Sequence, residues 1–587
     1  MVWEKMKKTK REFSYFGYLK RYKWTSFLAP FLKSIETVCE LFVPLIMAKI
    51  IDYGIASNDI NYIIWNGALI LVLNIIGFIF AVLSHKCAAI ASMGIGRDIR
   101  NDIFEHINNL SHAELDKFTT TTLLNRSVND VRNIQNGIGS VLRVIMRAPC
   151  LLIGSLVLAL IINIKLSLVF IVIIPLLILI VWFIMKKLKP LLVSIKGKLD
   201  KTTNVTRENL TGVRVVRAFN KQNFETEKFK NANYDLISTQ IKHGLWNSAL
   251  HPIISILVNF AIIAIFYFGG IEVNIGGLSQ GNLIAFIDYF GTISTCIIML
   301  SNLITIITRM NASSDRINEL FSVKNSIKDP ANPVKFDAED INLGKIEFKD
   351  VNFSYSNVKN AVTGLTLSVE PGEIIGVIGG TGSGKSSIVN LIPRFYDVTT
   401  GEILINDVNI KKYSVEDLRN FIGLVPQNPT LFEGTIRSNM CWRKPDATDE
   451  EIIKALRIAQ AYDFVKDYPD FLEHHVNRGG TNFSGGQRQR LTIARALVGN
   501  PHIIILDDAS SALDFATDAK LRKAIRTSLS TATTFIVTQR TNSIKDANKT
   551  IVVDNGKVVD IGTHEELLER CQVYQEIHYS QNKKETK

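Results

Sequence analysis

A glycine-rich segment, residues 379–386, has the residue types and spacing of a phosphate-binding loop. It reads GGTGSGKS, fits the pattern GxxxxGK[ST], and lies between a short apolar run and an amphipathic run, 387–395. The backbone N–H groups of such a loop attract anions, its lysine reaches the β- and γ-phosphates, and the next hydroxyl coordinates Mg²⁺. We expect ATP or GTP to bind at Gly379, Gly380, Thr381, Gly382, Ser383, Gly384, Lys385, Ser386 and Ser387.

An acidic residue later in the chain supports nucleotide binding. Residues 503–507, IIILD, form an apolar run that ends in a carboxylate, as expected of a buried strand. An aspartate at the end of such a strand can hold Mg²⁺ opposite the loop, so we expect Asp507 and Ser386 to share the ion. The alternative is that Asp507 only caps the next turn of the chain.

The composition indicates a membrane part joined to a water-exposed part. The chain has 587 residues, of which 47% are hydrophobic and 21% charged, and its mean hydropathy is +0.15. A disordered chain would be poorer in apolar residues, and a chain embedded throughout would not carry 67 Lys and Arg with 55 Asp and Glu. The six cysteines form neither a CxxC pair nor a Cys/His cluster, so we expect no zinc site and no disulfide framework.

Six long apolar runs in the first half predict membrane-spanning helices. A helix needs about 20 mostly apolar residues to cross about 30 Å of hydrocarbon. The third run is short, but its helical pattern can begin near Ile138. The stretches around runs 2 to 5 keep helical spacing, so we expect these helices to continue into the cytosol, with a short polar turn at each tip. The runs are 25–51, 62–84, 148–162, 166–185, 245–271 and 283–307.

The distribution of Lys and Arg predicts the orientation. Residues 1–24 carry eight and residues 186–243 carry thirteen, whereas the links 52–61 and 272–282 carry none. Positive charge marks the cytoplasmic side, so we expect a multi-pass protein of the plasma (inner) membrane with both termini and both long loops in the cytoplasm. The net charge of +12 is then explained by topology, and nucleic-acid binding is disfavoured.

The second half reads as a separate α/β domain. Residues 328–333, KDPANP, are typical of a linker because proline discourages helix on the residue before it. Residues 345–351 alternate polar and apolar, and residues 373–378 lead directly into the glycine-rich loop, so both are predicted strands. We therefore divide the chain into a cytoplasmic segment 1–24, a transmembrane domain 25–323, a linker 324–343 and a nucleotide-binding domain 344–587.

A third motif carries a family resemblance. Residues 483–490, FSGGQRQR, lie about twenty residues before Asp507 and resemble the signature motif of ATP-binding-cassette (ABC) proteins. Tyr355 resembles the adenine-stacking aromatic of that family, Gln427 its Mg²⁺- and interface-sensing glutamine, and Asp514 its D-loop aspartate. With the six runs in front, the chain resembles an ABC exporter half-transporter: an α-helical six-span transmembrane domain fused to an α/β P-loop NTPase domain, the ABC cassette.

The resemblance implies partners and residue roles. Two cassettes would face each other head to tail, with ATP and Mg²⁺ between one P-loop and the other chain's signature. Gln427 would join Ser386 and Asp507 at the Mg²⁺. Besides a second half-transporter subunit, the implied partners are membrane lipid and an amphipathic small-molecule substrate, with no nucleic acid. The signature residues that would touch the partner's nucleotide are Ser484, Gly485, Gly486 and Gln487.

Two positions depart from the family pattern. The family's general base is a glutamate, but here Asp508 follows Asp507, and a shortfall of about 1 Å can cost about 100-fold in rate. The family's later histidine is replaced by Gln539, which cannot carry charge. The chain thus resembles the degenerate subunit of a heterodimeric bacterial multidrug exporter. The alternatives are a slow homodimer, a lipid or peptide exporter, and an ATP-gated channel or regulator.

Two carboxylates in the first apolar run are candidates for the translocation cavity. Glu36 and Glu40 are spaced i, i+4 and share one helix face. Ionisable residues within a span are costly and usually face a bundle interior or a water-filled cavity. Lys33 and Glu36 can instead pair with each other or reach the headgroups. We expect Glu40, near mid-membrane, to line the cavity and to favour cationic substrates.

Overall fold

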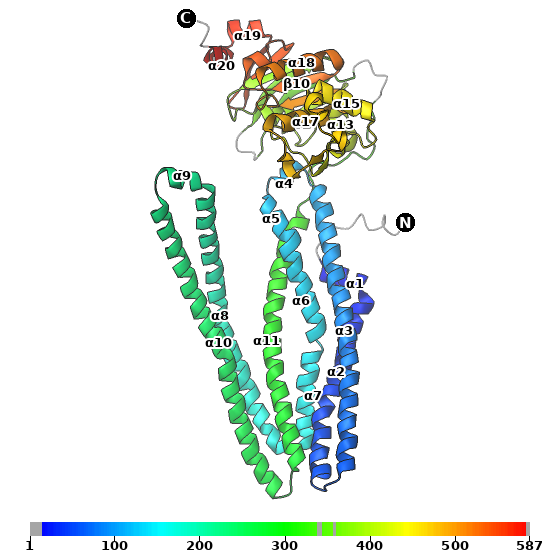
Figure 1. Ribbon diagram of the computed structural model, residues 1–587, viewed down its shortest axis with the longest axis vertical. Coiled ribbons are helices and arrows are strands. Elements are labelled where there is room, and N and C mark those ends of the chain that lie inside the picture. The colour runs from blue at the N-terminus through cyan, green and yellow to red at the C-terminus, as the bar shows by residue number, and fades with distance from the viewer. Residues whose placement is uncertain (1–13, 337–342, 356–359, 583–587) are drawn as a thin grey trace. The chain divides into compact units, whose positions relative to one another are not determined.

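The computed structural model describes residues 14–336, 343–355 and 360–582. The chain forms two compact units. The first, a bundle of long helices, contains the described residues up to Asn108 and residues 120–323 (Figure 1). The second, a mixed α/β unit, contains residues 109–119 and the described residues from Lys324 onward. Residues 1–13 of the predicted N-terminal segment and 337–342 of the predicted linker lie outside the described residues.

The helical unit is built from helices that pass well beyond the predicted apolar runs. Asn163 and Ser279 lie immediately before two of these helices, and their side chains accept backbone N–H groups of the first turn. These caps satisfy N–H groups that have no partner within the helix. The helices are α1 (Tyr15–Arg21), α2 (Lys23–Lys49), α3 (Ile60–Asn108), α5 (Thr120–Asn125), α6 (Val131–Val144), α7 (Arg147–Ile162), α8 (Ile164–Thr211), α9 (Val213–Ala218), α10 (Gln222–Asn274) and α11 (Gln280–Ser322), with π-helical turns at Ile50–Ile55 and Arg126–Asp130.

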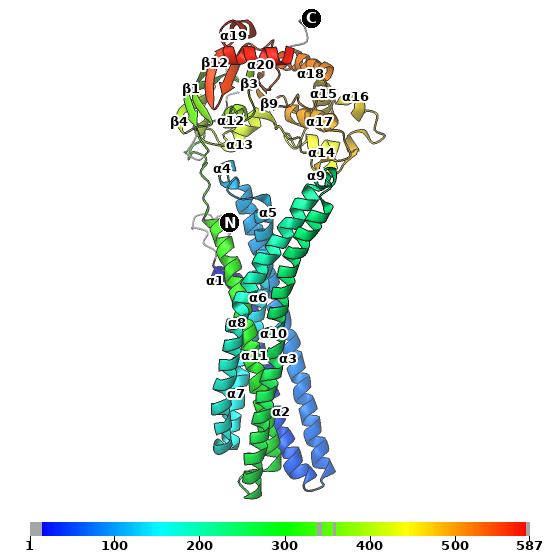
Figure 2. The ribbon, with the colours of Figure 1, turned by 90° about the vertical axis from the view of Figure 1, so that its left-hand side faces the viewer.

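Helices α8 and α10 run side by side as a long hairpin, and the short helix α9 closes its tip (Figure 2). The tip of the other long loop is α4 (His112–Leu115), which belongs to the second unit. Each tip therefore carries a short helix where the sequence predicted a polar turn. The third apolar run also differs from its prediction, because α6 and α7 are separate helices that meet at residues 145–146.

Five helical segments of the described chain are long and apolar enough to cross a membrane. They are α3, residues 120–162, α8, α10 and α11. The sequence predicted six, and α2 is the one that is not among these five. It contains Lys33, Glu36 and Glu40 within one apolar stretch, which lowers its hydropathy. The first unit is thus a helical transmembrane domain whose first predicted span carries charge.

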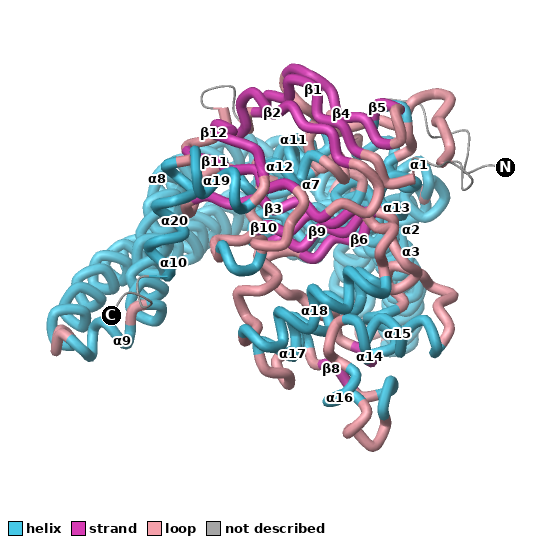
Figure 3. Tube along the Cα trace, turned by 90° about the horizontal axis from the view of Figure 1, so that it is seen from above, coloured by secondary structure: helices cyan, strands magenta, loops and turns pink. Residues whose placement is uncertain are grey.

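The second unit contains a ten-stranded sheet, visible as magenta strands in Figure 3. Its strand order is β5-β4-β1-β2-β12-β11-β3-β10-β9-β6, and β7 and β8 form a separate pair. Strands β3, β10, β9 and β6 are parallel neighbours, whereas β1 pairs antiparallel with β2 and β4. The three predicted strands are confirmed as β1, β3 and β9. The strands are β1 (Ile346–Phe353), β2 (Val362–Val369), β3 (Ile374–Gly379), β4 (Thr400–Ile405), β5 (Val408–Asn409), β6 (Ile422–Val425), β7 (Gly434–Thr435), β8 (His475–Val476), β9 (Ile503–Asp507), β10 (Thr533–Val537), β11 (Lys549–Asp554) and β12 (Lys557–Gly562).

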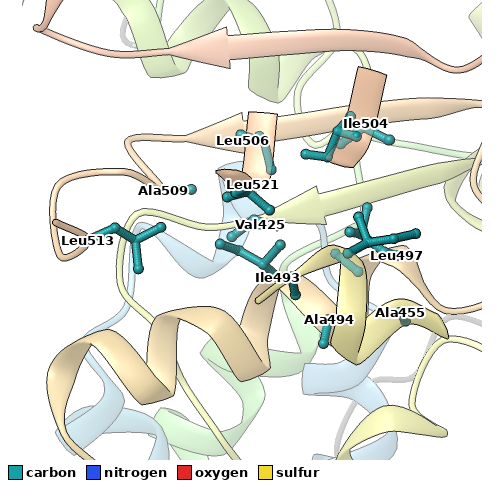
Figure 4. Packing of buried hydrophobic residues seen from close by; sticks show 14 of the residues in the cluster. Val425, Ala455, Ile493, Ala494, Leu497, Ile504, Leu506, Ala509, Leu513 and Leu521 are labelled. Carbon is teal, nitrogen blue, oxygen red and sulfur yellow. The ribbon is translucent and has the colours of Figure 1, made fainter. Parts of the chain in front are cut away.

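Two hydrophobic clusters hold this unit together. One joins β1, β2 and β3 to the helix after the glycine-rich loop. The other packs Val425, Ile493 and Leu506 between the sheet and α17 (Figure 4). Fully buried side chains of this size each contribute about 1.5–3 kcal/mol. The helices are α12 (Lys385–Leu391), α13 (Val415–Phe421), α14 (Ile436–Met440), α15 (Asp449–Ile458), α16 (Tyr462–Val465), α17 (Gly485–Leu497), α18 (Phe515–Ser528), α19 (His564–Arg570) and α20 (Gln572–Asn582).

Candidate functional site

The glycine-rich loop connects the buried strand β3 to the helix α12. Strand β3 ends at Gly379 and α12 begins at Lys385, so the loop opens at the carboxyl ends of the parallel strands. Gly384, the residue before the helix, has φ +104°, and a Cβ there would collide with the backbone oxygen of Ala361. Only glycine fits this position without a shift of the backbone. The loop is therefore held in the shape that presents its N–H groups.

The side chains of Lys385 and Ser383 are buried in the loop and are suited to bind an anion. The ammonium of Lys385, which is 9% exposed, donates to the carbonyl oxygens of Gly379 at 3.0 Å and Gly380 at 2.6 Å. Burial lowers the pKa of Lys385, and the nearby Asp508 opposes that shift. The buried hydroxyl of Ser383 has no hydrogen-bond partner in the described part of the chain. A phosphate in the loop would give Ser383 a partner and pair with the Lys385 charge, so the residues fit a nucleotide.

The Ser386 hydroxyl and the Asp507 carboxylate lie together. Ser386 Oγ donates to Asp507 Oδ1 at 2.9 Å, and Asp507 is the last residue of β9. Burial raises the pKa of Asp507, while the hydrogen bond from Ser386 lowers it. Hydroxyl and carboxylate oxygens are the ligands that Mg²⁺ prefers. The pair fits the predicted metal site.

Asp508 lies beside the loop with its backbone fixed. It has a left-handed φ of +49°, and its N–H donates to the carbonyl oxygen of Val537 at 3.0 Å. Burial raises the pKa of Asp508, and Lys385 opposes the shift most strongly. The Gln427 side chain hydrogen-bonds Asp508 and also lowers its pKa. Gln427 is therefore held near the position expected of a general base.

Gln539 follows β10 and lines the same cavity. Its backbone carbonyl accepts a hydrogen bond from Gln581 Nε2 at 2.6 Å. The side-chain oxygen Oε1 of Gln581 also accepts a hydrogen bond from the backbone N–H of Thr541 at 3.1 Å. The segment around Gln539 is thus anchored to α20, the last helix.

Tyr355 stands at the edge of the loop. Its hydroxyl lies 3.1 Å from Ser387 Oγ, and its ring packs nearly perpendicular to the rings of Phe353 and Tyr396. The Tyr355 side chain is 53% exposed. An exposed aromatic ring beside the loop can stack on a planar base.

One cavity of about 490 Å³ collects most of the predicted residues. Gly379 and Gly380, which were also predicted, do not line it, and their carbonyl oxygens accept hydrogen bonds from Lys385. The sequence analysis missed the Asn555-Gly556 turn, whose Gly556 N–H donates to the carbonyl oxygen of Ser383 at 2.9 Å. The Asn-Gly dipeptide between apolar runs signals a hairpin turn but not its contact with the loop. The lining residues are Tyr355, Asn360, Ala361, residues 381–387, Gln427, Asp507, Asp508, residues 537–539, Asn555 and Gly556.

The signature residues are placed away from this cavity. Ser484 caps α17: its hydroxyl accepts the Gln487 N–H at 3.3 Å, and the Gln487 side chain accepts the Ser484 N–H at 2.9 Å. Ser484 and Gly485 are exposed at the start of the helix. Asp514 caps α18 in the same way, by accepting the Thr517 N–H at 2.9 Å. An exposed helix N-terminus can bind an anion supplied by another molecule.

The two transmembrane carboxylates have basic partners. Lys33 forms an ion pair with Glu36 at 2.6 Å, and Arg147 of α7 bridges Glu36 at 3.0 Å and Glu40 at 3.1 Å. The Glu40 side chain is 46% exposed. The sequence analysis considered the Lys33–Glu36 pair but missed Arg147. Glu40 therefore has a basic partner, and its place in the cavity and its preference for cationic substrates stay predictions.

Asp288 on α11 is a membrane carboxylate that the sequence analysis missed. Its side chain is exposed, and it forms no ion pair with any of the residues that the structure describes. An acidic residue inside the apolar run 283–307 was the signal that could have found it. Thr295 and Asn302 are also exposed on α11, and their spacing of seven residues places them on the face of Asp288.

Comparison with known protein families gives two matches. Residues 26–297 match the model of the ABC transporter transmembrane region, and residues 362–511 match the ABC transporter model.

Relatives and a solved structure agree over nearly the whole chain. An uncharacterized ABC transporter ATP-binding protein of Mycobacterium tuberculosis is 37% identical over 94% of this chain and 95% of its own length. A Bacillus subtilis protein named for multidrug export, YgaD, is 31% identical over 97% and 99%, and an ATP-dependent lipid A-core flippase of Colwellia psychrerythraea is 30% identical over 91% and 90%. The structure of a bacterial Atm1-family ABC exporter with ATP bound matches with a TM-score of 0.79, at 22% identity, over 97% and 99%.

Proposed function

The chain belongs to the ABC exporter family, and from this premise we propose that it is the degenerate half of a heterodimeric exporter of amphipathic compounds. The cassette binds ATP, and ATP hydrolysis is coupled to transport. In the proposed complex this chain's own P-loop site hydrolyses ATP slowly. Its signature completes the site of a second half-transporter, where hydrolysis is fast.

One observation carries the proposal. Both altered residues, Asp508 and Gln539, line the cavity of this chain's own P-loop. The signature residues Ser484 and Gly485 are unaltered and exposed at the start of α17. The substitutions of the family's glutamate and histidine thus alter residues that act on this chain's own nucleotide. The signature residues, which would act on the partner's nucleotide, are retained.

The chemistry follows from these residues. At this chain's site, Lys385 and the loop N–H groups bind the phosphates, and Tyr355 stacks on the base. The Asp508 carboxylate accepts the proton of the attacking water, but it lies farther from that water than a glutamate carboxylate would. Gln539 offers a hydrogen bond but no positive charge. Binding therefore stays tight while turnover is slow.

Magnesium is proposed at Ser386 and Asp507, with Gln427 beside them. When bound, Mg²⁺ neutralises negative charge on the phosphates.

ATP drives transport by closing two cassettes. A nucleotide held by one P-loop and by the signature of the other chain binds the closed pair better than the open pair. Only such a difference in affinity can shift the conformational equilibrium. In the proposed complex, the exposed helix N-terminus at Ser484 supplies this chain's contact with the partner's nucleotide.

We place α2 in the membrane as the sixth span. Its ion pairs with Arg147 balance the carboxylates that lower its hydropathy, and paired charges within a bundle are tolerated. With six spans, both termini and the cassette lie in the cytoplasm at the plasma (inner) membrane, as the Lys and Arg distribution predicts.

For the substrate, the relatives named above include a multidrug export protein and a lipid A-core flippase. Both names fit a substrate with apolar and polar parts. The exposed polar face of α11, with Asp288, Thr295 and Asn302, is the proposed lining of the pathway. The second candidate is lipid flipping by a homodimer, which the flippase relative favours.

The test is to purify the tagged full-length chain from its native membrane. We expect a second ABC half-transporter, with glutamate and histidine at the two altered positions, to co-purify at a 1:1 ratio. ATPase activity of that complex should exceed that of the chain alone by about 100-fold. Robust turnover by the chain alone, without a second subunit, would support the homodimer instead.

A further inference from the structure

Helix α20 of the cassette carries three contact residues on one face. Tyr574, His578 and Gln581 are spaced i, i+4, i+7 and therefore share a helix face. Tyr574 is fully buried in a hydrophobic cluster of the cassette, and its hydroxyl lies 2.7 Å from His564 Nδ1. Helix α20 is thereby fixed beside β3, β11 and the turn Thr541–Ser543 (Figure 3).

The Gln581 amide forms two hydrogen bonds with the backbone on either side of Arg540. Its Nε2 donates to the Gln539 carbonyl oxygen at 2.6 Å, and its Oε1 accepts the Thr541 N–H at 3.1 Å. Because one bond needs the nitrogen and the other needs the oxygen, only one orientation of the amide satisfies both. His578 Nδ1 lies 3.2 Å from the hydroxyl of the fully buried Thr541. Helix α20 thus holds the backbone directly after Gln539.

The sheet holds the backbone directly before Gln539. The Thr538 N–H donates to the Val377 carbonyl oxygen at 3.0 Å, and the Arg540 N–H donates to the Thr538 hydroxyl at 3.0 Å. The Gln539 side chain is exposed and lines the nucleotide cavity, and it has no hydrogen-bond partner in the described part of the chain. The direction of that side chain is therefore set by the backbone that Thr538 and Gln581 hold on its two sides.

We propose that Gln581 is a positioning residue of this chain's nucleotide site, and that it holds Gln539 where the Gln539 amide donates to the terminal phosphate of ATP. This role depends on the proposed contact between Gln539 and the chain's own nucleotide. A histidine at this position could attract a phosphate by its charge, whereas glutamine offers only a hydrogen bond. A hydrogen bond weakens steeply when donor and acceptor are misaligned. An uncharged residue at position 539 therefore needs a fixed backbone.

The consequence is a contribution to the preference for ATP over ADP. ADP lacks the terminal phosphate, so it gains nothing from a correctly placed Gln539. A general loss of structure in the cassette would instead weaken the binding of ATP and ADP alike. The ratio of the two affinities therefore separates a positioning role of Gln581 from a purely structural role.

The experiment is equilibrium binding to the full-length chain in lipid nanodiscs, with Mg²⁺ and either ADP or the non-hydrolysable β,γ-imido analogue of ATP. We expect Gln539→Ala to weaken binding of the analogue about tenfold, which is the effect of one hydrogen bond to a charged acceptor. Gln581→Ala should weaken it by about threefold or more, because Gln539 is then misaligned but still present. Both variants should leave ADP binding unchanged.

A double variant and two further variants assign the effect. In the Gln539→Ala background, Gln581→Ala should cause no further loss, since the residue that it positions is gone. Gln581→Glu keeps the acceptor for the Thr541 N–H but loses the donor to the Gln539 carbonyl, so it should behave like Gln581→Ala. The matched control is Gln575→Ala on the same helix, which removes a bond from Nε2 to the Leu568 carbonyl oxygen at 2.7 Å. This control should bind both nucleotides as wild type does.

The outcomes separate this inference from the proposed function. Wild-type binding of the analogue by Gln581→Ala, with a loss in Gln539→Ala, would overturn the inference alone. Unchanged binding of the analogue by Gln539→Ala would overturn the proposed contact with the terminal phosphate, and the inference with it. Equal weakening of the analogue and ADP by Gln581→Ala, additive losses in the double variant, or a selective loss in Gln575→Ala would also overturn the positioning role.

Discussion

Replacing Asp508 by glutamate should restore hydrolysis at this chain's own site. The backbone of Asp508 is fixed by its bond to the Val537 carbonyl, so the side chain length decides how far the carboxylate reaches. Glutamate adds one carbon–carbon bond, about 1.5 Å. The cavity of about 490 Å³ has room for the added methylene.

The magnitude follows from the geometry. A misplacement of about 1 Å costs about 100-fold, and a positioned general base contributes about 100- to 10,000-fold. We expect Asp508→Glu to raise turnover about 100-fold, which corresponds to about 2.7 kcal/mol of barrier. Adding Gln539→His should raise it further, because a histidine can carry positive charge toward the phosphate.

The assay must isolate this chain's site. Phosphate release is measured in the co-purified complex after the partner's own P-loop lysine has been replaced by alanine, so that only this chain's site can turn over. Asp508→Asn is the matched control, since it keeps the size of aspartate and removes the base. The thermal unfolding midpoint of each variant shows whether the protein still folds when a different side chain occupies this left-handed position.

Two results would refute the reasoning. Equal turnover of wild type and Asp508→Glu would mean that side chain length is not what limits this site. High turnover of Asp508→Asn would mean that no carboxylate is needed there.

Three further predictions follow from the structure. Lys385→Ala should weaken nucleotide binding to this chain at least tenfold, because a buried cation is lost, yet leave measurable turnover of the complex; equilibrium binding and phosphate release check this, and total loss of turnover would contradict it. Asp288→Asn should reduce transport of a cationic compound but not of a neutral analogue, and Glu40→Gln should do so to a smaller extent because Arg147 already pairs with Glu40; a vesicle transport assay with the two compounds decides. Residual turnover at this chain's site should rise with pH through the raised pKa of Asp508, because only the deprotonated carboxylate accepts a proton, and a pH–rate profile that falls over the same range would contradict this.

The nucleotide site could be predicted because its signals are local. The loop 379–386 and the strand that ends at Asp507 are each continuous in sequence, and their patterns specify strand, turn and helix directly. Parallel pairing of β3, β10 and β9 then brings their carboxyl ends together. The sequence therefore predicted which residues share the cavity, although it missed the Asn555-Gly556 turn, whose place beside the loop depends on the order of strands.

The contacts that could not be predicted are between residues far apart in the sequence. They depend on the direction in which each side chain points after folding. Arg147 and Glu40 are 107 positions apart, and the sequence does not specify which faces of α2 and α7 meet. Tyr396 and Asp116 are 280 positions apart, and no pattern in the sequence links a loop tip to the cassette. The break between α6 and α7 was missed because residues 145–146 contain neither proline nor glycine.

The most direct test of the central claim compares two substitutions in the purified complex. Gly485→Asp places a negative charge in the signature, where it would repel the partner's nucleotide phosphates, and Asp508→Ala removes the weak base of this chain's own site. We expect Gly485→Asp to reduce ATP hydrolysis by at least 100-fold, whereas Asp508→Ala should change it less than twofold. Equal losses for the two variants, or a larger loss for Asp508→Ala, would contradict a division of labour between the two sites.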